Sequence, residues 1–126
     1  MSADREILKQ WIDRAENDLI AAEILFNSNP LILDIACFHC QQSIEKFLKA
    51  FLVYNQKEFL LTHNLEYLIS LCAEIDSDFI NHDLNNLSLY AVRTRYPHDH
   101  LAPEKEEVMD YLKLCNVIKG LVLSKI

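Results

Sequence analysis

Apolar residues recur along most of this chain at steps of three and four, the spacing that places them on one face of an α-helix. The first such repeat, over residues 3–27, joins Leu8, Trp11, Ala15, Leu19 and Ala22. A polar stretch containing Pro30 follows it and ends the periodicity. The pattern therefore predicts a long amphipathic helix at 3–27 with Trp11 on its buried face.

Four further helices follow from the same reasoning. Residues 31–55 are apolar nearly all round in their first half, which predicts the central helix. A shorter helix opens at 62–66, with Thr62 or Asn64 as its N-cap, and buries apolar positions as far as Ile75. Two more are predicted at 81–96 and 103–123. Together they predict an all-α, up-and-down helical bundle of about five helices in a single domain spanning residues 1–126.

Composition supports a helical protein and limits its expected cellular location. The chain is 51% hydrophobic but holds one glycine, Gly120, too few for a phosphate loop or a series of tight hairpins. No apolar run reaches the ~18 residues that span a bilayer, and the first residues do not resemble a signal peptide. We therefore expect a cytoplasmic protein with no membrane association.

The four cysteines lie inside apolar helical patterns, where free core thiols are common. Cys37 and Cys40 flank His39 in a spacing that resembles a metal-binding motif, but a zinc site needs two further ligands and no second cluster matches it. We therefore expect neither a metal nor a cofactor.

Net charge limits the possible partners. With 19 acidic against 12 basic residues the formal charge is −7, which opposes binding of long double-stranded DNA. Any nucleic acid must instead be held by a local basic patch, as a short or single-stranded segment.

Two of the chain's four arginines lie together with two histidines and two tyrosines in one short segment, residues 90–100. Arg93 and His98 are separated by four residues, and so are Arg95 and His100. An arginine can hold a phosphate through its fork of donors, and an imidazole can transfer a proton near neutral pH. The alternative is structural: both arginines complement the dipole at a helix end, and the proline after Tyr96 terminates that helix.

Three residues elsewhere leave similar alternatives. His63, at the start of the third predicted helix, either lines the same pocket as these arginines or contacts loop carbonyls. Glu45 and Lys46 interrupt the apolar surface of the second helix, and an ion pair within that helix or between subunits is the simplest reading.

Four signatures in order resemble the HEPN domain of prokaryotic proteins. They are Trp11 with 15-AENDL-19, 36-ACFHCQQSIEKFLKA-50, 62-THNL-65 and 95-RYP-97. The resemblance covers nearly the whole chain and implies a four-helix core plus a short helix. It also implies a homodimer, a separately encoded minimal nucleotidyltransferase as partner in a toxin–antitoxin-like system, and, in some branches, metal-independent ribonuclease activity.

The resemblance also implies functional residues. In nuclease branches an arginine precedes a histidine by four to six residues, so the candidate catalytic pairs are Arg93 with His98 and Arg95 with His100. The chain departs from that motif, because Thr94 follows Arg93 and Tyr96 with Pro97 follows Arg95, where the motif commonly carries a residue such as asparagine. The residues implied for nucleotide or phosphate binding are Arg93, Arg95, Tyr96, Tyr90 and His63.

Three classes of function thus remain: a dimeric module that binds a nucleotide, phosphate or short RNA and pairs with a nucleotidyltransferase; a metal-independent endoribonuclease; and a purely structural interaction domain. We favour the first.

Overall fold

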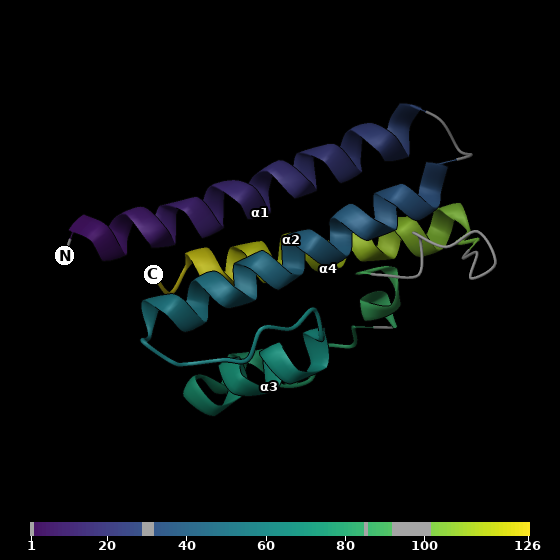
Figure 1. Cartoon of the computed structure of the whole chain (residues 1–126). Coiled ribbons are helices and arrows are strands. Elements are labelled where there is room, and N and C mark those ends of the chain that lie inside the picture. Colours follow the sequence, from purple (N-terminus) through teal and green to yellow (C-terminus); the bar gives the residue numbers. More distant parts are fainter. Residues whose placement is uncertain (1, 29–31, 85, 92–101) are drawn as a thin grey trace.

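The structure is a computed structural model that describes residues 2–28, 32–84, 86–91 and 102–126. Over these residues it is an all-α helical bundle (Figure 1). Its α-helices are α1 (Ser2–Ser28), α2 (Leu33–Tyr54), α3 (Leu65–Ile75) and α4 (Lys105–Leu123). Two 3-10 helices, η2 (Ser77–Phe79) and η3 (Leu87–Ala91), lie between α3 and α4.

The helices lie alongside α2 in two directions (Figure 1). α1 runs antiparallel to α2, whereas α3 and α4 both run in the direction of α2. Side-chain contacts give the register: Ser43 Oγ of α2 donates to the carbonyl of Ala15 at 2.8 Å, and Cys115 Sγ of α4 donates to the carbonyl of Cys40 at 3.4 Å. The up-and-down order therefore holds for α1 and α2. Between α2 and α3 the non-helical chain runs back along α2, so that α3 begins beside the first half of α2 and runs in the same direction.

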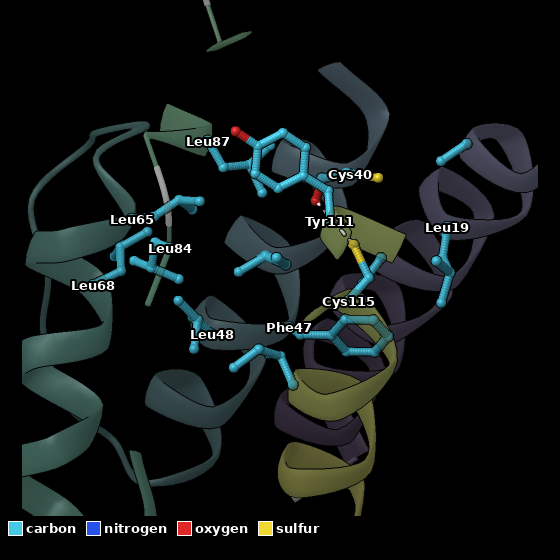
Figure 2. Packing of buried hydrophobic residues seen from close by; sticks show 14 of the residues in the cluster. Leu19, Cys40, Phe47, Leu48, Leu65, Leu68, Leu84, Leu87, Tyr111 and Cys115 are labelled. Atoms are coloured by element: carbon cyan, nitrogen blue, oxygen red, sulfur yellow. Dashed lines mark hydrogen bonds between the residues drawn. The ribbon is translucent and has the colours of Figure 1, made fainter. Parts of the chain in front are cut away.

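α2 is the centre of the bundle, as its all-round apolar composition predicts. Fourteen of its 22 residues are buried, and it contacts α1, α3, η3 and α4. Figure 2 shows Leu48 directed toward the leucines of α3 and Cys40 beside Tyr111 and Cys115 of α4. Phe47, Ile44 and Leu48 are fully buried and belong to one core cluster with residues of α1, α3 and α4.

The cysteines are free thiols in this core. Burial raises the pKa of the Cys72 thiol to about 12, and it raises the pKa of the Cys37 thiol as well. A thiol so placed packs as a small apolar side chain, because its reactive thiolate form is disfavoured.

Trp11 lies less deeply than predicted. Ala15, Leu19 and Ala22 of the predicted α1 stripe are buried, but Trp11 is only half-buried. It lies near the N-terminal part of α1, where the ammonium of Lys49 stands 5.5 Å from its ring centroid. The indole thus covers a charged group of α2 and does not enter the apolar core.

The predicted helix at 81–96 is wrong over its described part. Residues 87–91 form the 3-10 helix η3, and turns precede it. Asn81 and Asn86 have positive φ angles of 69° and 63°, which belong to the left-handed region and interrupt a right-handed helix. Asparagine tolerates that region better than most residues, so the asparagines mark turns here. Residues 92–96 lie outside the described part.

The start of α3 follows a standard capping arrangement. Asn64 Oδ1 accepts from the backbone N–H of Tyr67 at 2.9 Å, which makes Asn64, of the two predicted candidates, the N-cap. Thr62 Oγ1 accepts from the N–H of Asn64 at 3.0 Å and holds the preceding turn. Within the described residues, no helix is both long enough and apolar enough to cross a membrane.

We expect Phe47→Ala to lower the free energy of unfolding by about 3–5 kcal/mol, because Phe47 is fully buried and truncation leaves a cavity. Trp11→Ala should lower it by less, roughly 1–2 kcal/mol, since the indole is partly exposed already. Chemical denaturation followed by circular dichroism measures both. An equal or larger loss for Trp11→Ala would contradict the placement of α1.

Candidate functional site

Most of the predicted site residues lie outside the described part of the chain. Arg93, Arg95, Tyr96, His98 and His100 all fall within residues 92–101. Their grouping into Arg–His pairs therefore stays a prediction. The two remaining candidates, Tyr90 and His63, are described, and both lie beside α2.

His63 belongs to a polar network built on one face of α2. Gln41, Glu45 and Lys49 are spaced four residues apart, so their side chains share this face. Glu45 Oε2 accepts from Lys49 Nζ at 3.0 Å, and Glu45 Oε1 accepts from His63 Nδ1 at 2.8 Å and Gln41 Nε2 at 3.3 Å. The carboxylate is thus satisfied by three donors, although its side chain is only 4% exposed.

The chain between α2 and α3 covers this network. It turns back after α2, with the N–H of Lys57 bonded to the carbonyl of Leu52 at 2.9 Å. It then passes Lys49, whose ammonium lies 5.8 Å from the ring centroid of Phe59. Finally it reaches Gln41, whose amide donates to the carbonyl of His63 at 3.0 Å. Lys49 therefore meets two aromatic rings, Trp11 and Phe59, and the ion pair has little contact with solvent.

The ring of His63 is the part of this network most open to solvent. Its side chain is 54% exposed, against 4% for Glu45 and 7% for Lys49. Donation from Nδ1 to the carboxylate selects the tautomer in which Nε2 of a neutral ring carries the lone pair. A histidine oriented in this way can accept a proton, or bind a phosphate when it is protonated.

Tyr90 has a different environment. It is buried, and its ring packs edge-on against Tyr111 of α4 with centroids 6.0 Å apart. Burial raises the pKa of the Tyr90 phenol, and the neighbouring thiol of Cys37 adds to the effect. In this arrangement Tyr90 fixes η3 to α2 and α4.

η3 adjoins His63 through the start of α3. Ser88 Oγ accepts from the N–H of Leu65 at 3.0 Å and donates to Glu66 Oε2 at 2.8 Å. These bonds attach η3 to the start of α3 at Leu65 and Glu66. Leu65 follows His63 by two residues in the sequence. The chain then leaves η3 at Ala91, two residues before Arg93.

A second polar cluster joins α1 to α2. Asp18 accepts from His39 Nδ1 at 2.8 Å through Oδ1 and from Lys46 Nζ through Oδ2. Lys46 therefore pairs with α1 of its own chain, while Glu45 pairs within α2. Lys49 was not among the residues predicted from the sequence to form an ion pair, although the four-residue step from Glu45 to Lys49 places both side chains on one face of the helix.

The fold and this site define an all-α domain whose central helix buries a charged pair, with a histidine from the segment before α3 bonded to the carboxylate of that pair. The HEPN domain family model matches residues 8–125, and the chain belongs to this family. Comparisons with curated proteins and with solved structures gave no significant match.

Replacing one member of the buried pair should be more damaging than replacing both. We expect Glu45→Met to lower the free energy of unfolding by about 3–5 kcal/mol, since it leaves the Lys49 ammonium without its partner. The double variant Glu45→Met with Lys49→Met should recover most of that loss, because no uncompensated charge remains. Denaturant titration of four proteins, the wild type, Glu45→Met, Lys49→Met and the double variant, gives the coupling; additive losses would show that the two residues do not interact.

Proposed function

We propose that this HEPN-family chain is a homodimeric nucleotide- or phosphate-binding module that pairs with a separately encoded minimal nucleotidyltransferase. Arg93 and Arg95 hold the phosphate, and Tyr96 and His63 complete the site. The observation that carries the proposal is the placement of His63, which a buried carboxylate orients beside the element that leads into Arg93.

Three features support a binding role. Glu45 restrains His63 to one ring orientation, so the side chain loses little freedom when it meets a ligand. Tyr90 anchors η3 in the core and so limits where the following residues start. In this role Tyr90 positions the segment and does not touch the phosphate. The net charge of −7 favours a small ligand held by local cations over a long polyanion.

Isothermal titration calorimetry with ATP and a ten-nucleotide RNA tests the ligand. Arg93→Ala and Arg95→Ala should each weaken binding about tenfold, the value of a charge-assisted hydrogen bond to phosphate. Lysine at either position should restore only part of the affinity, because an ammonium lacks the bidentate fork. Arg5→Ala, an exposed arginine in α1, is the matched control.

Light scattering should give twice the 14.7 kDa mass of the chain. Co-purification with the nucleotidyltransferase encoded nearest to its gene tests the partner. A monomer that binds neither ligand would contradict the proposal and leave a structural role.

A second candidate function is metal-independent ribonuclease activity, and the His63–Glu45 pair is the observation that favours it. A carboxylate that orients an imidazole is a common arrangement for proton transfer. In this reaction a histidine, His98 or His100, takes the proton from a ribose 2′-hydroxyl as that oxygen attacks phosphorus. An arginine balances the charge, and the bond from phosphorus to the 5′-oxygen breaks as that oxygen takes a proton from protonated His63, giving a cyclic phosphate.

The nuclease reading predicts RNA cleavage in the presence of EDTA. His98→Ala or His100→Ala should abolish it while RNA binding persists, and Glu45→Gln should slow it by misorienting His63. His82→Ala is a control, because the ring of His82 bonds to the carbonyl of Asp78 and not to Glu45. Cleavage that survives both the His98 and the His100 substitution would exclude these residues as the catalysts.

A further inference from the structure

A hollow of about 360 Å³ opens between α1 and α2 on the side of Trp11. Its described lining consists of Ile7, Gln10, Trp11, Arg14 and Lys46, with two cations and no acidic side chain. Such a lining is unusual on a chain of charge −7. The hollow beside α3, by contrast, is lined by Glu66 and Asp83 among others.

The two cationic side chains, Arg14 and Lys46, differ in exposure and in their ion pairs. Arg14 is exposed, and its guanidinium has no ion pair or hydrogen bond with any described residue. Lys46 is partly buried and shared with Asp18. Arg14 therefore supplies an unneutralised fork of donors at the rim, and Lys46 adds charge from a fixed position at the side of α2.

Trp11 gives the hollow its apolar part. Its indole is half-buried and meets the ammonium of Lys49, which holds it against α2. An aromatic surface beside an arginine fork suits a planar base that carries a phosphate, since bases stack on aromatic rings and phosphates pair with guanidinium. The volume lies near the lower end of the range for small-ligand sites, which favours a mononucleotide over a longer chain.

We propose that this hollow binds a nucleoside monophosphate, with the base against Trp11, the phosphate on Arg14 and Lys46, and Gln10 bonding to the base or sugar. The site is built from α1 and α2. It therefore adds a second binding site to the function proposed above and does not depend on residues 92–101.

Trp11 is the sole tryptophan of the chain, so its fluorescence reports directly on the hollow. Titration with adenosine 5′-monophosphate should change that fluorescence saturably. Adenosine and inorganic phosphate, each carrying half of the recognised chemistry, should bind at least about tenfold more weakly. Absence of a saturable change up to 10 mM nucleotide, or equal affinity for phosphate alone, would overturn the proposal.

Variants separate this site from others. Arg14→Ala should weaken binding of the monophosphate about tenfold, and Arg14→Lys should recover part of it. Arg5→Ala is the control, because Arg5 is also an exposed arginine of α1 but lines the neighbouring hollow. Equal weakening by Arg5→Ala would indicate general charge attraction and overturn the site.

The Arg93→Ala, Arg95→Ala double variant should leave the fluorescence titration unchanged. If it abolishes the signal, the nucleotide belongs to the segment after η3 and the hollow is not its site. If instead the Arg14 variant loses the signal while Arg93 and Arg95 prove silent in calorimetry, the inference stands and the function proposed above fails.

Discussion

Because α2 is covered on nearly every side, the polar groups it carries must find partners inside the protein, and this constraint organises much of the fold. Glu45 and Lys49 pair with each other, Gln41 bonds to the returning chain, and Ser43 bonds to the backbone of α1. Among the described residues, no buried side-chain nitrogen or oxygen is left without a hydrogen bond. Burial of such a group without a partner would cost roughly 1–3 kcal/mol. The polar groups of α2 therefore help to fix the positions of α1 and of the segment before α3, which supply their partners.

Local pattern was sufficient for the main helices and insufficient for the connection after α3. The stripes of α1, α2 and α4 are properties of neighbouring residues and could be predicted from spacing, whereas spacing left Thr62 and Asn64 as alternative caps of α3. The stretch from 81 to 91 also shows helical spacing in Leu84, Leu87 and Ala91, all buried. Asn81 and Asn86 adopt left-handed angles, however, and the spacing of apolar residues does not encode those angles.

The same limit applies to the site. Sequence spacing suggested that Glu45 takes part in an ion pair, but its link to His63 joins residues 18 apart through a return of the chain that no local signal announces. The Arg–His segment was identifiable by composition alone. The hollow beside Trp11 was not, because it needs Arg14 of α1 and Lys46 of α2 to face one opening.

The parallel course of α2 and α4 has a consequence for how the chain assembles. α1 and α2 are joined by a short connection and contact each other extensively, so they can associate as a local hairpin early in folding. α4 reaches α2 only across a separation such as the 75 residues between Cys40 and Cys115, and it can dock correctly only when the intervening chain has turned back. Closing that larger loop carries the greater entropic penalty, which makes the arrival of α4 the natural late step and its edge of the bundle the first to open.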